Sequence, residues 1–317
     1  MRNQINVLCH FLLLWVVSSC THTPVSEGRV KTNLAVPYEV IGVLSPKSIH
    51  EVKNDLTLGC EVLDRDYADY HQYKEYIVPL GLKKIRLQAG WAKTEKIKGV
   101  YDFAWLDKAV ALAAKYDLKV IMCTSTATPP VWLSRKYPEI LIKNENGTVL
   151  DHGARQHASF ASPVYRELAY KMIEKLAQHY GNDSRIIGWQ LDNEPAVQFD
   201  YNPKAELAFR DFLREKYHHD IKALNDAWGT AFWSEVYSSF DEITLPKTAQ
   251  MFMNHHQILD YRRFAASQTN DFLNEQCLLI KKYAKNQWVT TNYIPNYEEG
   301  HIGGSPALDF QSYTRYM

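Results

Sequence analysis

Hydrophobic residues recur along the chain with two spacings, and each spacing predicts one kind of secondary structure. Short apolar runs bounded by turn residues are typical of strands that are buried on both faces. Apolar residues three and four positions apart predict amphipathic helices at 105–116 and from Ser162-Pro163 to about 180. The apolar runs predict five strands, at 56–62, 83–88, 119–125, 185–194 and 288–294.

This alternation of strands and helices predicts an α/β fold with a parallel sheet. Polar residues follow the later strands directly, and the carboxyl ends of parallel strands are where (β/α)8 barrels, or TIM barrels, build active sites. We therefore expect a TIM-barrel type of fold that is incomplete, because about five strands are present before Met317. The last residues are interpreted as the helix that follows the fifth strand.

The start of the chain differs in composition from the rest. A basic residue precedes the apolar run 11–17, and Cys20 follows it. Such a segment is typical of an export signal, and its end resembles a bacterial lipobox, in which Cys20 would carry a lipid. An ordinary signal peptide or a short anchor is the alternative. The expected organisation is a lipoprotein-type signal peptide at 1–20, a flexible tether at 21–35 and a partial catalytic barrel at 36–317.

This start predicts where the protein is found and how it meets a membrane. We expect an exported protein, either an outer-membrane lipoprotein of a bacterium or a periplasmic protein. Contact with the membrane would then be made through the lipid anchor on Cys20.

Charge and cysteine content exclude several classes of protein. Lys+Arg and Asp+Glu number 36 each, so no excess of basic residues predicts binding to nucleic acid. The cysteines beyond Cys9 and Cys20 are three scattered residues, which give neither a disulfide framework nor a paired zinc motif. Assembly into a homo-oligomer stays open.

The clearest chemical signal lies in the segment 188–195, which reads Gly-Trp-Gln-Leu-Asp-Asn-Glu-Pro. Its first half continues an apolar strand, and Pro195 disfavours a helical conformation at Glu194. Glu194 is therefore expected at the carboxyl end of a buried strand, beside the amide of Asn193. A carboxylic acid there can protonate a leaving oxygen while the amide binds a sugar hydroxyl, so the pair indicates a sugar-cleaving enzyme. The alternative is a carboxylate that only caps a neighbouring helix.

Further motifs, in a fixed order, surround this segment. They are Thr128-Pro-Pro-Val-Trp-Leu-Ser-Arg-Lys-Tyr-Pro-Glu-Ile-Leu141, His152-Gly-Ala-Arg-Gln-His157, Ser162-Pro-Val-Tyr-Arg166, Ala227-Trp-Gly-Thr-Ala-Phe-Trp-Ser234 and Val289-Thr-Thr-Asn292. Together they make the region from about 91 to 309 resemble glycoside hydrolase family 42, the β-galactosidases with a TIM-barrel catalytic domain.

The resemblance implies roles for four residues. Glu194 would be the general acid/base, and Asn193 would bind the sugar. Arg155 falls where the family has a substrate-contacting arginine, and Trp233 falls at an aromatic position that forms a wall of the sugar site. The structural alternatives are a salt bridge for Arg155 and core or lid packing for Trp233. His157 is interpreted as a support for Arg155, and no cofactor is implied.

The chain departs from the family pattern in three places. Ser159 stands where some members have a metal-binding cysteine, so no structural metal is expected. The segment 59–66 is unlike the family's first strand and loop, which leaves the identity of the sugar open. The nucleophile of such barrels follows strand seven, which lies beyond the strands expected here. Glu298 and Glu299 are the alternative nucleophiles within the chain.

The expected function is that of a retaining glycoside hydrolase acting on terminal β-linked sugars, a β-galactosidase by resemblance, in carbohydrate catabolism. Its partner would be an oligosaccharide or glycoside substrate. Two alternatives stay open: a glycosidase directed at β-mannan or β-xylan, and a non-catalytic, glycan-binding surface lipoprotein without a nucleophile.

Overall fold

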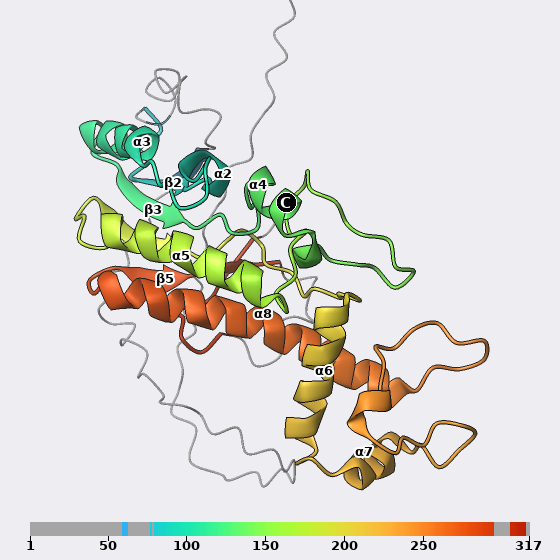
Figure 1. The fold of residues 1–317 in the computed structure, drawn as a ribbon. Helices are drawn as coiled ribbons and strands as arrows, with labels where there is room; N and C mark the ends of the chain where they lie inside the picture. Colours follow the sequence, from blue (N-terminus) through green and yellow to red (C-terminus); the bar gives the residue numbers. More distant parts are fainter. Residues whose placement is uncertain (1–58, 63–76, 78, 295–304, 315–317) are drawn as a thin grey trace, which may run out of the picture.

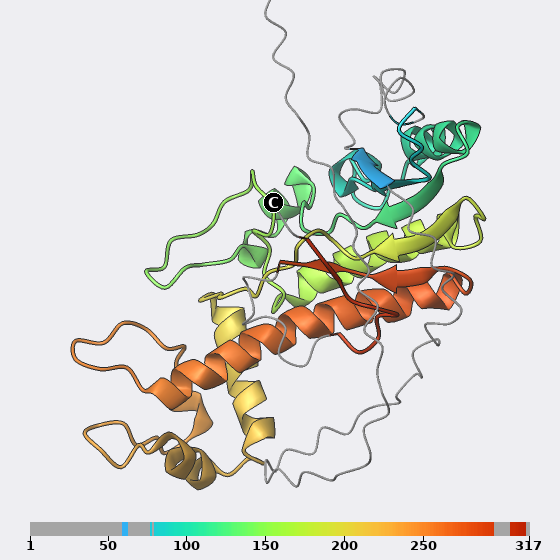
Figure 2. The ribbon, with the colours of Figure 1, turned by 180° about the vertical axis from the view of Figure 1, so that it is seen from behind.

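The computed structural model describes residues 59–62, 77, 79–294 and 305–314. Its centre is a parallel five-stranded sheet whose strands lie side by side in chain order (Figures 1 and 2). Parallel neighbours in sequential order are the arrangement of an open segment of an α/β barrel, so the predicted fold class is confirmed. The strands are β1 Gly59–Val62, β2 Lys84–Gln88, β3 Lys119–Cys123, β4 Ile186–Gln190 and β5 Trp288–Thr290.

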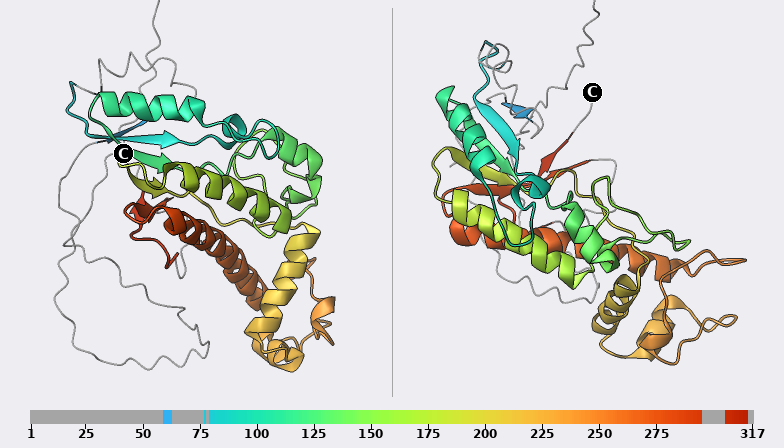
Figure 3. Two further views of the ribbon diagram at one scale, coloured as in Figure 1. Left: turned by 60° about the vertical axis from the view of Figure 1, so that its left-hand side comes forward. Right: turned by 45° about the horizontal axis from the view of Figure 1, so that its top comes forward.

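Helices connect the strands and cover one face of the sheet (Figure 3). The predicted start of α5 is confirmed, because Ser162 Oγ accepts from the backbone N–H of Tyr165 at 3.3 Å and Pro163 occupies the first turn. Among the described residues, no helix combines the length and apolar character needed to cross a membrane. The helices are α2 Trp91–Thr94, α3 Ala104–Lys115, α4 Val131–Lys136, η3 Pro138–Ile140, α5 Pro163–Tyr180, α6 Pro203–Lys216, α7 Ile221–Trp228, η4 Phe240–Glu242 and α8 His255–Tyr283.

The main core lies between the sheet and helices α3, α5 and α8. Alternate strand residues enter it, as the period of two in a strand requires. The residues between them, such as Arg86 and Gln190, therefore point toward the opposite, concave face of the sheet. That face is polar at the carboxyl ends of the strands, where the site is found. The strand residues in the helix-facing core are Ile85, Leu87, Val120, Met122, Ile186, Trp189 and Val289.

A second core surrounds the first part of α8 and joins it to α6 and α7 (Figure 1). We call residues 203–264 the helical lobe. Its centre holds the carboxylate of Asp260, which is buried and accepts hydrogen bonds from Tyr217 Oη at 2.6 Å and Trp228 Nε1 at 3.0 Å. The lysine Lys216 also pairs with it. The lobe is thus fixed to α8 by polar contacts as well as by apolar packing.

The end of the chain differs from the sequence-based expectation. Strands β6 Asn292–Tyr293 and β7 Ser312–Tyr313 pair in parallel, and the N–H of Thr314 donates to the carbonyl of Tyr293 at 2.8 Å. The helix predicted after the fifth strand is therefore wrong for residues 312–313. Burial alternates along this segment with the period of two that a strand has: Ser312 and Thr314 are buried, whereas Tyr313 is 52% exposed. A sixth barrel strand begins here.

The segment between β3 and α5 brings the Arg155 motif to the sheet. It contains α4 and η3, followed by antiparallel bridges that pair Leu141 with Ala158 and Lys143 with Val149. The backbone N–H of Gln156 then donates to the carbonyl of Ala127, just after β3, at 2.7 Å. The loop 151–157 is thereby held beside the carboxyl end of β4.

Candidate active site

The turn that follows β4 has an uncommon backbone conformation. Asp192 and Glu194 have positive φ angles of 47° and 51°, and Gln156 on the facing loop has a φ of 62°. Such conformations in residues other than glycine cost about 1–3 kcal/mol each and persist only where the surroundings fix them. Three of the seven such residues in the described part of the chain therefore meet at this one place.

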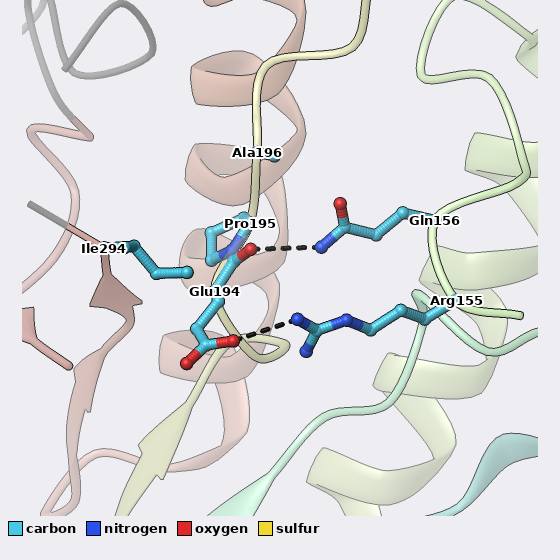
Figure 4. A pocket seen from close by; sticks show the side chains of 6 residues that line it. All are labelled: Arg155, Gln156, Glu194, Pro195, Ala196 and Ile294. Atoms are coloured by element: carbon cyan, nitrogen blue, oxygen red, sulfur yellow. Dashed lines mark hydrogen bonds and ion pairs between the residues drawn. The ribbon is translucent and has the colours of Figure 1, made fainter. Parts of the chain in front are cut away.

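Glu194 is the centre of this place. Its side chain is buried, with 5% exposed, and Oε2 accepts a hydrogen bond from Arg155 Nη2 at 2.9 Å. Gln156 Nε2 donates to the backbone carbonyl of Glu194 at 3.0 Å. Figure 4 shows both side chains reaching Glu194 from the same side, with Ile294 on the other. Arg155 and Glu194 thus form an ion pair at the edge of the site.

A cavity opens beside Glu194 (Figure 4). Its volume is about 160 Å³. The described residues that line it are Arg155, Gln156, Glu194, Pro195, Ala196 and Ile294.

Asn193 is held by donors on two sides. Its Oδ1 accepts from Arg86 Nη2 at 3.0 Å and from Asn292 Nδ2 at 3.1 Å. Arg86 is itself buried and pairs with Glu61 on β1 at 3.1 Å. Its Nε and Nη1 have no partner among the described residues.

Asp192 does not face the cavity but anchors the turn. Its buried carboxylate accepts from the hydroxyl of Thr126, from the N–H of Ala127 at 2.9 Å and from Gln276 Nε2 at 3.3 Å. Burial raises the pKa of Asp192, and these hydrogen bonds oppose that rise. Because Ala127 also accepts from Gln156, the chain of contacts from Asp192 through Ala127 and Gln156 returns to Glu194.

His157 supports the loop that carries Arg155. It is buried, and its Nδ1 lies 2.9 Å from the carbonyl of Ala154. Its Nε2 lies 3.5 Å from Ser134 Oγ, which in turn lies 3.1 Å from His152 Nδ1. Burial is the main cause that lowers the pKa of His157, so the ring is neutral in the folded protein near neutral pH. His157 thus contacts the backbone next to Arg155, and its support of the Arg155 side chain stays a prediction.

Two tryptophans lie away from the cavity. Trp233 is 61% exposed in the helical lobe, stacked on Phe252 with ring centroids 6.3 Å apart, and is not among the described residues that line the cavity. Its contact with sugar stays a prediction. Trp189 packs in the helix-facing core and donates from Nε1 to Gln287 Oε1 at 2.5 Å. The alternation along β4 places it on the face opposite Gln190.

Two residues that contact Glu194 were not predicted from the sequence. Gln156 contacts Glu194 directly, and its position next to Arg155 in the motif 152–157 could have indicated this. Asn292 contacts both Asn193 and the backbone of Glu194, and its position as a polar residue in the strand predicted at 288–294 could have indicated this.

Other predictions fall outside the part of the chain that the structure describes. They concern Cys20, the tether, most of the segment 59–66, and the alternative nucleophiles Glu298 and Glu299. Ser159 is described: it is buried and its Oγ accepts from the N–H of Ala161 at 3.1 Å. The described residues contain no cluster of histidine, cysteine, aspartate and glutamate that could hold a metal ion.

Fold and site together define a class of protein. A buried carboxylate beside an amide, at the carboxyl end of the fourth strand of a parallel α/β sheet, is typical of TIM-barrel enzymes. A comparison with family models makes the class specific: the model of glycoside hydrolase family 42, described as beta-galactosidase, matches residues 68–317. The chain belongs to glycoside hydrolase family 42.

Individual relatives agree with this membership. The β-galactosidase of Thermus thermophilus is 39% identical over 241 residues, which are 74% of this chain and 37% of the relative. The β-galactosidase Pbg of Clostridium perfringens is 38% identical over 227 residues, 72% of this chain and 32% of the relative. The crystal structure of β-galactosidase from the psychrophilic Marinomonas ef1 matches with a TM-score of 0.78 at 32% identity, covering 82% of this chain and 40% of that one. The chain spans less than half the length of these relatives.

Proposed function

We propose that the protein containing this chain is a retaining glycoside hydrolase that removes terminal β-linked sugars, with β-galactosides as its first substrate class. The observation that carries the proposal is the buried Glu194 beside Asn193 at the end of β4, facing a cavity of about 160 Å³. The relatives described above are named as β-galactosidases, which supports β-galactosides as the first substrate class.

In this proposal Glu194 moves the proton in both halves of the reaction. A sugar entering the cavity offers hydroxyl acceptors to Arg155, whose side chain is 48% exposed. Once the guanidinium turns to the sugar, Glu194 loses the charge that favours its ionised form and can hold a proton. It then protonates the leaving oxygen, and later removes a proton from the attacking water.

Retention also requires a nucleophile. The second carboxylate has to lie about 5–5.5 Å from the first. Glu194 is the one carboxylate among the described residues that line the cavity. We place the nucleophile on a later strand of the barrel, and keep Glu298 and Glu299 as alternatives.

The same observation supports a second candidate function. A chain with the sugar-binding groups but without a nucleophile would bind a terminal β-linked sugar and not cleave it. Arg155, Asn193 and Glu194 supply donors and acceptors for such binding. A glycan-binding surface protein is therefore the alternative that the test has to separate from the enzyme.

The test is hydrolysis of a panel of aryl β-glycosides, with the galactoside, mannoside and xyloside side by side. Both this chain without residues 1–20 and the longest reading frame that contains it are assayed. Since a general acid/base contributes about 10²–10⁴-fold, Glu194→Gln is expected to lower turnover of the galactoside by that factor. Glu167→Gln, on an exposed pair with Lys171, is the matched control and should change nothing.

Each outcome of this assay has one meaning. Unchanged turnover by Glu194→Gln would contradict the assignment of the acid/base. Binding of galactose in calorimetry by folded protein, with no turnover in either form, would support the glycan-binding alternative. A preference for the mannoside or xyloside would keep the mechanism and replace the substrate class.

We also propose that the protein is exported and anchored in a membrane by a lipid on Cys20. The support is the basic, apolar and small-residue order of the first twenty positions. Cells given radiolabelled palmitate are expected to label the protein, and Cys20→Ser should abolish the label. A labelled Cys20→Ser variant would contradict the anchor.

A further inference from the structure

Asn292 links Asn193 and Glu194 to strand β6, in which it lies. Its side chain is buried, with 1% of the residue exposed. Its Oδ1 accepts from the backbone N–H of Glu194 at 3.0 Å and from Gln190 Nε2 at 2.7 Å. Its Nδ2 donates to Asn193 Oδ1 at 3.1 Å and to Thr314 Oγ1 at 2.7 Å. Both polar atoms of the carboxamide therefore make two hydrogen bonds each, the full capacity of an asparagine.

These contacts fix which end of each amide is oxygen. A backbone N–H can only donate, so the atom of Asn292 that faces Glu194 has to be the oxygen. The nitrogen of Asn292 then has to face Asn193 and donate to it. Arg86 has only donors, so it requires the same orientation of Asn193 independently.

One donor group is left over by this arrangement. With Oδ1 of Asn193 occupied by Arg86 and Asn292, its Nδ2 donates to no described residue. Asn193 is only half-buried, so this NH2 group can reach a ligand. The site thus offers a sugar hydroxyl a donor at this point, not an acceptor.

We propose that Asn292 is a positioning residue for Asn193 and Glu194: it fixes the left-handed backbone of Glu194 and, together with Arg86, turns the NH2 group of Asn193 toward the sugar. The inference rests on the proposed role of Glu194 and names the residue that sets its geometry. Asn292 itself does not touch the sugar. Its effect comes through one backbone hydrogen bond and one side-chain hydrogen bond, which two substitutions can separate.

The two substitutions are Asn292→Ala and Asn292→Asp. Alanine removes both contacts. Aspartate keeps an acceptor for the N–H of Glu194 and for Gln190, but it replaces the donor to Asn193 by a second acceptor. Asn193 Oδ1 then loses its donor at position 292, while the donor of Arg86 keeps the carboxamide in its orientation. Asn202→Ala is the matched control, since Asn202 is equally buried but caps α6.

NMR measures both contacts without needing catalysis. The backbone N–H of Glu194 should exchange about tenfold faster in Asn292→Ala and at the wild-type rate in Asn292→Asp. The side-chain NH2 resonances of Asn193, assigned with Asn193→Asp, should move in both variants, because Asn193 Oδ1 loses its donor at position 292 in each. Asn202→Ala should leave the exchange rate and the NH2 resonances unchanged, which separates positioning from a general loss of stability.

Activity supplies the second readout. In whichever form turns over an aryl β-galactoside, Asn292→Asp is expected to lower kcat more than it raises KM, because bonds to the sugar hydroxyls strengthen in the transition state. Unchanged exchange of Glu194 in Asn292→Ala, or unchanged side-chain NH2 resonances of Asn193 in both variants, would overturn the inference. The expected exchange pattern in a protein that neither binds nor cleaves galactosides would uphold the positioning and contradict the proposed function instead.

Discussion

Glu194 and Trp233 share an uncommon backbone conformation, with φ angles of 51° and 54°, but their surroundings are opposite. Arg155 and Gln156 donate hydrogen bonds to Glu194, the backbone N–H of Glu194 donates to Asn292, and Glu194 is 6% exposed. Trp233 is 61% exposed and contacts the rings of Phe232 and Phe252, the latter in a parallel stack.

The difference shows what each region needs in order to form. The turn after β4 is fixed within the chain by contacts from four segments that are distant in the sequence, so its strain of about 1–3 kcal/mol per residue is offset locally. The exposed aromatics of the helical lobe have no comparable support. A sugar-site role for Trp233 would thus require groups other than its present neighbours, whereas the role of Glu194 would not.

The largest effect is expected from removing the anchor of the turn. Asp192→Ala leaves the donors of Thr126, Ala127 and Gln276 without their buried acceptor. At about 1–3 kcal/mol for each unsatisfied group, the free energy of unfolding should fall by about 3 kcal/mol or more. Urea denaturation followed by circular dichroism measures it.

Two variants sharpen that result. Asp192→Asn keeps a carbonyl acceptor for the N–H of Ala127 and should lose less than half as much stability. Asp226→Ala, on an exposed pair with Lys222, is the control and should change little. If Asp192→Ala is as stable as this control, the hydrogen bonds of Asp192 do not stabilise the turn after β4. The turn would then differ from the loop of Trp233 in burial only.

The strands and helices that position the site could be predicted from the sequence, but the hydrogen bonds between its residues could not. The strand at 119–123 and the helix at 163–180 agree with the predictions, because apolar spacing reports which faces are buried. The strand predicted at 185–194 ends at Gln190, because the left-handed residues Asp192 and Glu194 cannot continue it, so Glu194 lies in the turn after the strand and not at its last position. The contact between Asn292 and Glu194 joins residues 98 positions apart. Such a pair depends on strand register, which no local pattern encodes.

An intermediate effect is expected at His157, and it depends on pH. Burial lowers the pKa of this histidine below its ordinary value of about 6.5, so the unfolded chain binds a proton more readily than the folded one. Stability is then fully present above about pH 6.5 and is lost as the pH falls through the lowered pKa. His157→Asn, which can still donate to the carbonyl of Ala154, should remove this part of the acid dependence.

Unfolding curves between pH 4 and pH 8 measure the effect, with the exposed His256→Asn as the control. His152 and Asp151 also act electrostatically on His157, so the wild-type slope alone does not isolate the contribution of His157. The informative quantity is the difference in slope between wild type and His157→Asn. A difference of zero below pH 6.5 would show that His157 does not link the Arg155 loop to acid stability.

The smallest effect on folding is expected at Trp233. Because it is exposed and makes only aromatic contacts, Trp233→Ala should change the free energy of unfolding by about 0.5 kcal/mol or less. Trp228→Ala in the same lobe is the matched contrast: that ring is 2% exposed and bonded to Asp260, so about 3–5 kcal/mol should be lost. A large loss for Trp233→Ala would mean that its loop is held as firmly as the turn at Glu194. A small loss together with weaker galactoside binding would assign Trp233 to the sugar and not to the fold.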